Sequence, residues 1–322
     1  MPAEDRVRKL PCWTGPIEVV PLKGGVSNAS FTVQDRTGKY VARVGEDYPF
    51  HHVFREAEVI ASQAAFEAGL SPEVVYTEPG IMVVRFIEAR TYAEADVRAN
   101  ADACVDIVKR CHAEMGKRIS GRANFFWVFH VLRDYAHTLR AAKHRHVADI
   151  PRWMAEVERL EKAQVPLPII FGHHDLLPTN FMDDGTRLWL IDWEYGGFGT
   201  AMFDLANIAS NNQFDAQAEH DLLTQYFERK PDLATLRSFY AMKTASALRE
   251  AVWRPSWCAS SAAPHSWEPP SGSCCTPTTN SVGGRRRRRS SPGSWRRACI
   301  PRPSRMPMWR RRRRTRRCAD PA

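Results

Sequence analysis

The chain has 322 residues, 43% of them hydrophobic, which is enough to bury one large core or two smaller ones. No apolar run approaches the roughly 18 residues that a membrane helix requires, and the first residues lack the apolar segment of a secretory signal. We therefore expect a globular protein of the cytoplasm that contacts no membrane. The eight cysteines form no CxxC pair and no Cys/His spacing typical of zinc, so we expect neither a structural metal nor a disulfide framework.

The formal charge of +10 would suit a nucleic-acid-binding protein, but it is concentrated in residues 254–322. This segment holds 17 Arg, no Lys and only two acids, a net charge of +15, so residues 1–253 carry −5. It contains no Leu, Phe or Tyr, and such a composition cannot bury enough apolar surface to order a chain. We expect a disordered Arg/Pro/Ser-rich tail.

Two interpretations of the tail stay open. Its arginine runs would bind nucleic acid non-specifically, or the segment is what a GC-rich gene yields when it is read out of frame. We favour the second, because the composition changes abruptly just after a well-formed amphipathic helix.

The first third of the chain predicts a small antiparallel sheet with one helix, and the rest is mainly helical. The predicted strands are residues 17–22, 30–34, 39–44, 73–77 and 81–87, and the helix between them is residues 54–69. From about residue 92 the spacing is helical, apart from β-rich segments at 168–172 and 187–192. This order predicts an α+β protein with an N-terminal lobe at 1–88, a larger helical lobe at 89–253 and the tail.

The densest polar signal is the stretch FGHHDLLPTNFMDDGTRLWLIDWEYGG, residues 171–197. Asp175 and Asn180 lie five positions apart in a loop between predicted strands, and Asp192 ends the next strand. Phosphoryl transfer needs one carboxylate for the proton of the attacking hydroxyl, and an amide and a second carboxylate for Mg²⁺. The stretch resembles the catalytic loop of protein kinases. We assign His173 a structural role and regard His174 as a plain loop residue.

The first predicted lobe supplies candidates for binding a nucleotide. Gly24 and Gly25 lie between two strands, where glycines let backbone N–H groups approach phosphates. Arg43 lies on the third strand, either beside the phosphates or facing solvent. Glu56 is the preferred carboxylate to pair with Arg43, and Glu58 stays an alternative.

Several spaced motifs together resemble the choline/ethanolamine kinase family, a part of the aminoglycoside phosphotransferase group with a protein-kinase-like two-lobed fold. These motifs are LxGGxSN, an Arg on the third strand, HxDxxxxN, IDWEYGG, FDLAN and SALREAVW, and they cover roughly residues 17–253. The resemblance implies that ATP is bound between the lobes and that its γ-phosphoryl group is transferred to a small amino alcohol.

The resemblance also implies roles for individual residues. Asp175 would be the catalytic base, and Asn180 and Asp192 would hold Mg²⁺. Residues that would contact the nucleotide are Gly24, Gly25, Ser27, Asn28, Arg43, Glu56, Phe86 and Ile87. Residues that would contact the substrate are Glu194, Tyr195, Asn211 and Trp253.

Two departures from the family pattern bear on the acceptor. Asn211 stands where eukaryotic choline kinases carry an acid, and the tail replaces a further helix that would complete the substrate wall. Alternative functions are therefore an aminoglycoside or other small-molecule phosphotransferase, or an inactive homologue with a nucleic-acid-binding tail. The sequence leaves the oligomeric state open.

Overall fold

The computed structural model describes residues 1–22 and 27–259. The chain separates into two units, Met1–Thr276 and Pro277–Ala322, and the first contains every described residue. Gly24 and Gly25 lie outside the described residues, and so does the predicted tail beyond Ala259. No helix in the described ranges is both long enough and apolar enough to cross a membrane.

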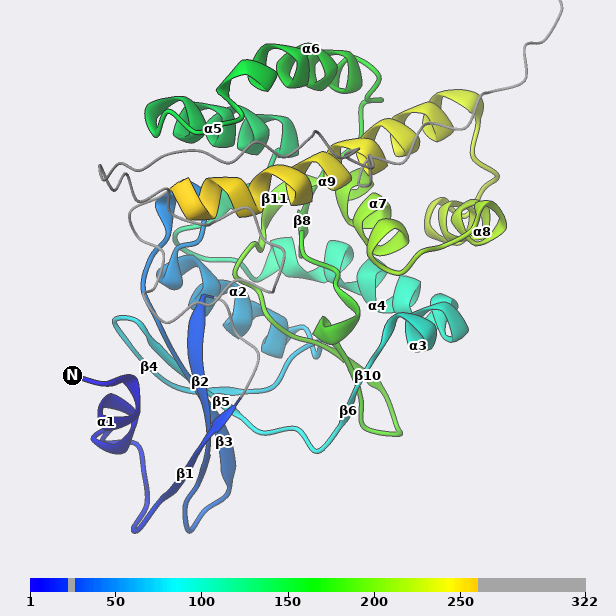
Figure 1. Cartoon of the computed structure of the whole chain (residues 1–322). Coiled ribbons are helices and arrows are strands. Elements are labelled where there is room, and N and C mark those ends of the chain that lie inside the picture. Colours follow the sequence, from blue (N-terminus) through cyan, green and yellow to red (C-terminus); the bar gives the residue numbers. More distant parts are fainter. Residues whose placement is uncertain (23–26, 260–322) are drawn as a thin grey trace, which may run out of the picture. The chain divides into compact units, whose positions relative to one another are not determined.

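The N-terminal lobe is a five-stranded antiparallel sheet in the order β1-β2-β3-β5-β4 (Figure 1). Its strands are β1 (Glu18–Leu22), β2 (Asn28–Gln34), β3 (Lys39–Gly45), β4 (Val74–Glu78) and β5 (Ile81–Arg85). Strand β3 alternates strictly, so Tyr40, Ala42 and Val44 enter the lobe's own core while Val41 and Arg43 face the other way.

Two helices accompany the sheet. Helix α1 (Ala3–Arg8) packs Val7 into the sheet core, and the sequence analysis did not predict it. Helix α2 (Arg55–Glu67) follows the short turn η1 (Pro49–His51). Its small buried residues Ala61, Ala64 and Ala65 belong to the core of the larger lobe. The helix therefore connects the two lobes.

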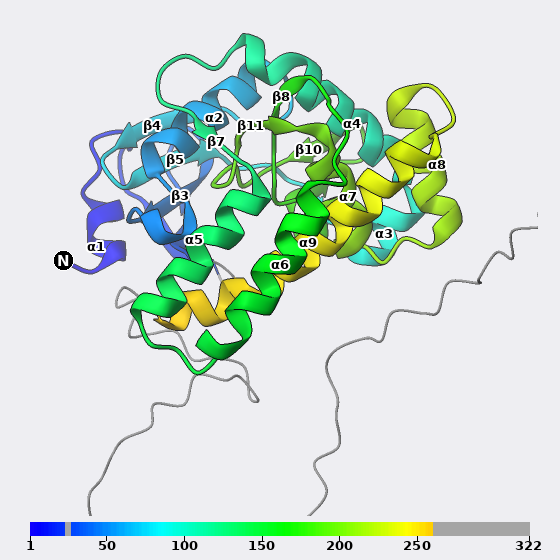
Figure 2. The same ribbon diagram turned by 90° about the horizontal axis from the view of Figure 1, so that it is seen from above.

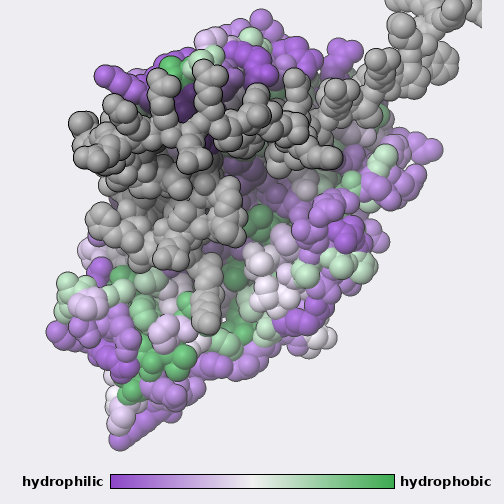
Figure 3. Space-filling view, viewed as in Figure 1, coloured by the Kyte–Doolittle hydropathy of each residue, from purple (hydrophilic) through white to green (hydrophobic). Residues whose placement is uncertain are grey.

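The larger lobe is mainly helical, as predicted. Its helices are α3 (Glu94–Ala99), α4 (Ala101–Glu114), α5 (Val128–Ala141), α6 (Ile150–Glu161), α7 (Ala201–Asn211), α8 (Ala216–Phe227) and α9 (Leu233–Ala259), with short turns η2 (Met115–Lys117), η3 (Val147–Asp149) and η4 (Pro178–Asn180). Figure 2 shows α5, α6 and α9 side by side. Figure 3 shows a mostly hydrophilic surface over the helices at the top of the view. This agrees with α6, which buries only Ile150, Val157 and Leu160.

Short strands in the larger lobe carry the polar loops. They form two sheets, β10-β9-β6 and β7-β11-β8. Their bounds are β6 (Arg90–Thr91), β7 (Asn124–Phe125), β8 (Ile169–Gly172), β9 (Phe181–Asp183), β10 (Leu188–Leu190) and β11 (Gly197–Thr200). The loop from β8 to η4 and the turn after β10 therefore come to the same place (Figure 1). The predicted succession of a small antiparallel sheet lobe and a larger helical lobe is confirmed.

Candidate active site

A cavity of about 680 Å³ lies between the sheet lobe and the helical lobe. It collects most of the predicted site residues: Ser27, Asn28, Arg43, Phe86, Ile87, Asp175, Asn180, Asp192, Glu194, Tyr195 and Trp253. Glu56 and Asn211 lie outside the lining. The amide of Asn211 donates instead to the carbonyl of Leu176, so this residue supports the loop from behind.

The loop that carries Asp175 is held by two side chains of α7. The buried carboxylate of Asp204 accepts the backbone N–H groups of His173 at 2.8 Å and of His174 at 2.7 Å. The amide oxygen of Asn207 accepts the N–H of Leu176 at 2.6 Å. The FDLAN motif indicated only the family resemblance, and the structure shows that its two polar residues position the loop.

The two loop histidines are both structural. The Nε2 atom of His173 lies 2.9 Å from the carbonyl oxygen of Ile191, in agreement with its predicted role. His174 is more than the plain loop residue that we predicted. It is fully buried, stacks on Phe126 with 4.3 Å between ring centroids, and places Nε2 3.0 Å from the Gly197 carbonyl oxygen. It thereby joins the loop to β11.

Arg43 reaches across the cavity to both lobes. Its guanidinium lies 2.6 Å from the Asp192 carboxylate and 3.0 Å from that of Glu58. The prediction of Glu56 as its partner is wrong. Glu56 is largely exposed and lies 3.8 Å from Arg122. Helix positions two apart point about 200° from each other, and the packing of α2 turns Glu58 toward the sheet.

A second arginine, which the sequence analysis missed, connects the start of α2 to the cavity. Arg55 is buried and donates to the Glu58 carboxylate at 2.6 Å and to the carbonyl of Ser27 at 2.9 Å. It also lies 3.5 Å from Glu194, whose carboxylate accepts the hydroxyl hydrogen of Ser27 at 2.5 Å. Ser27, at the end of the first hairpin, is thus fixed both to α2 and to Glu194 in the loop after β10.

Carboxyl groups outnumber guanidinium groups in the described part of the cavity lining. Among the residues that the structure describes, the lining includes four carboxyl groups, Asp175, Asp192, Glu194 and Glu250, and two guanidinium groups, Arg43 and Arg249. Burial, reinforced by Glu250, Glu194 and Asp192 against the opposing effect of Arg249, raises the pKa of Asp175 to about 8. Burial and the charge of Asp192 also raise the pKa of Glu194.

The groups predicted to bind Mg²⁺ fit that ion chemically. Asn180 is fixed by its amide, which donates to the Asp175 carbonyl at 2.8 Å. Asp192 has a left-handed backbone, with φ of 69°, a conformation that costs free energy in a non-glycine residue and is typical of functional sites. Oxygen atoms of carboxylates and amides are the ligands that Mg²⁺ prefers.

Helix α9 closes the far side of the cavity. The indole of Trp253 donates to the Tyr195 hydroxyl at 3.1 Å. Buried Arg249 lies 3.8 Å from the Asp175 carboxylate, 2.7 Å from that of Glu250 and 4.5 Å from the centre of the Tyr195 ring. The SALREAVW motif contained this arginine, but its role could not be inferred before the helix was placed.

The segment after β5, whose residues Phe86 and Ile87 were predicted to contact the nucleotide, forms one edge of the cavity. Phe86 and Ile87 both line it. The backbone N–H of Phe86 already donates to the carbonyl of Lys39 at 3.0 Å. A purine base would therefore use other backbone groups of this segment.

Comparisons with known proteins agree with this geometry. Residues 18–239 match the family described as the phosphotransferase enzyme family. The protein LicA of Haemophilus influenzae is 26% identical over 208 residues, 63% of this chain and 61% of LicA. A probable ethanolamine kinase of Arabidopsis thaliana is 27% identical over 274 residues, 72% of this chain and 71% of that protein. The chain thus spans about three fifths of LicA.

The fold agrees as well. A crystal structure of a choline/ethanolamine kinase family protein from Mesorhizobium loti superposes with a TM-score of 0.61 at 26% identity, over 78% of this chain and 84% of that one. The predicted fold class and the predicted family resemblance are confirmed.

Proposed function

Because the chain belongs to the phosphotransferase enzyme family, we propose that it is an ATP-dependent kinase that phosphorylates the hydroxyl of a small amino alcohol such as choline or ethanolamine. One observation carries the proposal. Asp175, Asn180 and Asp192 line a single cavity between two lobes, although they come from three different places in the loop region. One proton acceptor and two oxygen ligands are the groups that phosphoryl transfer requires.

Asp175 is the base in this mechanism. It accepts the proton of the acceptor hydroxyl while that oxygen bonds to the γ-phosphorus and the bond from the γ-phosphorus to the bridging oxygen breaks, releasing ADP. Asp175 must be ionised for this, and the guanidinium of Arg249, 3.8 Å away, favours the charged form. The hydrogen bonds from α7 hold its loop in position.

The remaining residues bind and orient the nucleotide. Asn180 and Asp192 would hold Mg²⁺, which when bound neutralises negative charge on the phosphate oxygens. Arg43 would contact the phosphates, and Glu58 would fix its side chain from α2. Ser27 and Asn28, at the end of the first hairpin, line the cavity and would contact the phosphates.

The acceptor class is supported by the kinds of group around Asp175. Glu250 would place negative charge near the amine of the acceptor. The aromatic rings of Tyr195 and Trp253 form part of the cavity wall. One contact favours a second candidate, an aminoglycoside or another hydroxylated amine. The guanidinium of Arg249 already lies over the Tyr195 ring, which leaves less aromatic surface for a quaternary ammonium group.

The test is Mg·ATP-dependent phosphorylation by the purified chain across choline, ethanolamine and aminoglycosides. We expect Asp175→Asn to lower kcat by about 10²–10⁴ while the Kd for ATP changes by less than about threefold, because a general base acts on the chemical step. Asp221→Asn, at an exposed site on α8, is the control. Equal turnover by the wild type and Asp175→Asn would reject Asp175 as the base, and no turnover on any acceptor would reject the kinase function.

A further inference from the structure

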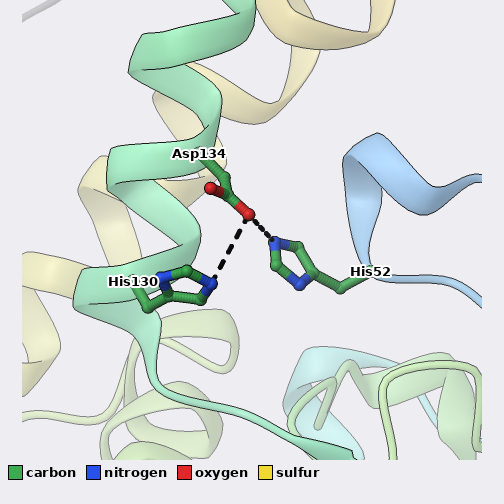
Figure 4. Close-up of side chains that lie close together, drawn as sticks. All are labelled: His52, His130 and Asp134. Atoms are coloured by element: carbon green, nitrogen blue, oxygen red, sulfur yellow. Dashed lines mark ion pairs between the residues drawn. The ribbon is translucent and has the colours of Figure 1, made fainter.

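A second group of metal-ligating side chains lies outside the cavity, where the sheet lobe meets α5. His52 directly follows η1, and His130 and Asp134 lie on α5. Figure 4 shows the three side chains pointing toward one another. None of them lines the active-site cavity.

The distances suit a single ion. The Nε2 atoms of His52 and His130 lie 3.0 Å and 3.5 Å from the same Asp134 oxygen. The potential ligand atoms of the three residues all lie within 4.8 Å of one another. Ligand atoms about 2.0–2.2 Å from a tetrahedral Zn²⁺ are roughly 3.2–3.6 Å apart. Small side-chain rotations would therefore complete the coordination.

The backbone holds the ligands in place without a metal. His130 and Asp134 are four positions apart on α5, so they share one face of the helix. His52 has a left-handed backbone with φ of 62°, its N–H donates to the Pro49 carbonyl at 3.0 Å, and its own carbonyl accepts the Asn124 amide at 3.4 Å.

Solvent can reach the cluster. The side chain of His52 is 20% exposed, whereas those of His130 and Asp134 are 59% and 47% exposed. An ion could enter from this side and keep water as its fourth ligand, as three-residue zinc sites do.

We propose that His52, His130 and Asp134 bind one divalent transition metal ion, with Zn²⁺ the best match. Two imidazoles and one carboxylate select Zn²⁺ and similar ions over Mg²⁺, which prefers oxygen ligands only. The site is thus separate in position and in chemistry from the catalytic Mg²⁺ position. Sequence spacing could not reveal it, because His52 is far in sequence from the other two ligands.

The bound metal would join the two lobes. It would connect η1, just before the helix that carries Glu58, to α5. The neighbouring His51 already places Nδ1 3.1 Å from the Tyr135 hydroxyl of α5, and its ring lies 5.2 Å from that of Trp253 in the cavity wall. The metal would therefore stabilise the contact between the lobes close to Trp253 in the wall of the active-site cavity.

The test is calorimetric titration of the chelator-treated full chain with Zn²⁺, comparing wild type, His130→Ala, Asp134→Asn and His137→Ala. His137 is an exposed histidine on the same helix and serves as the matched control. We expect wild type and His137→Ala to bind one more equivalent of Zn²⁺ than the other two. The comparison also subtracts any binding by the cysteines, which all four proteins share.

Thermal unfolding gives an independent readout. At free Zn²⁺ of about 100 times Kd, the Tm of wild type and His137→Ala should rise by roughly 5–10 °C, and that of His130→Ala by much less. Equal metal-free Tm values would show that His130→Ala folds normally. In a Co²⁺ titration, the spectrum of the wild type minus that of His130→Ala should contain no thiolate charge-transfer band, because no cysteine belongs to the proposed site. Identical stoichiometry and affinity in all four proteins would overturn the proposal.

Discussion

The raised pKa of Asp175 means that a cationic ligand bound nearby would displace a proton from this carboxyl group. The pKa of Asp175 is about 8 in the free protein, so at pH 7.5 this carboxyl group is mostly protonated. A bound cation favours the ionised form and lowers the pKa. We predict that binding of a cationic acceptor such as choline at pH 7.5 releases a fraction of a proton, up to about one. Calorimetry in buffers of different ionisation enthalpy measures this number, and a binding enthalpy independent of the buffer would contradict it.

The same raised pKa fixes the direction of the pH dependence. Because the base must be ionised, kcat/KM at low Mg²⁺ should increase from pH 6 with a midpoint near pH 8 and level off above about pH 9. The midpoint of this increase should move to lower pH as Mg²⁺ is added. A pH profile that falls over this range would show that Asp175 does not act as the base.

Two glutamates of α2 form a matched pair for testing the role of Arg43. Glu58→Gln removes a charge 3.0 Å from the Arg43 guanidinium, and a lost hydrogen bond between charged groups is worth about 1.5–3 kcal/mol. We expect the KM for ATP to increase by roughly tenfold or more. Glu56→Gln changes a side chain that is 67% exposed and should leave KM unchanged. Equal effects of the two substitutions on the KM for ATP would show that Glu58 does not hold Arg43 in place.

The sequence predicted the catalytic groups better than their partners. Asp175, Asn180 and Asp192 belong to one continuous stretch with a characteristic spacing, so their convergence could be expected. Which glutamate faces Arg43 depends on the rotation of α2 about its axis, and tertiary packing sets that rotation. The contacts of Arg249 with Asp175 join residues far apart in sequence, which no local pattern records.

At the scale of elements, α7 is the support of the catalytic loop. Burial would raise the pKa of Asp204, but its electrostatic interaction with His174 and its hydrogen bond with His112 hold this pKa well below its usual value. The stabilising effect of Asp204 is therefore present above the ordinary Asp pKa of about 4 and is lost as the pH falls.

Asp204→Asn should lower the free energy of unfolding by about 3–5 kcal/mol, because it breaks a buried charged network. Urea unfolding at pH 7 measures the loss. Asp221→Asn, on the exposed face of α8, should change stability by less than about 0.5 kcal/mol. A loss below about 1 kcal/mol for Asp204→Asn would mean that the loop does not depend on this carboxylate.

Long elements with strong periodicity were predicted close to their observed bounds, and short ones were missed. The predicted helix at 54–69 is α2, Arg55–Glu67, and the three predicted N-terminal strands are β1, β2 and β3. Helix α1 has six residues and β7 has two, too few for any periodicity to emerge. Their formation depends on contacts with the sheet core and with β11, which are tertiary.

At the scale of the whole molecule, every cavity-lining residue that the structure describes precedes residue 254. Helix α9 nevertheless continues to Ala259, six residues past the predicted boundary, and buries Pro255 and Ser256.

We predict that a chain ending after Ala259 keeps kcat/KM within about twofold and loses any salt-dependent binding of nucleic acid. A chain ending after Trp253 should have a lower Tm. Loss of activity in the chain that ends after Ala259 would show that the basic segment takes part in catalysis.

The central claim is that Asn180 and Asp192 bind the metal of a Mg·nucleotide in the cavity. Its most direct test is calorimetric measurement of ATP binding with and without Mg²⁺ in wild type and Asp192→Asn. We predict that Mg²⁺ tightens ATP binding at least tenfold in wild type and has little effect in Asp192→Asn. Equal strengthening by Mg²⁺ in both proteins would contradict the claim.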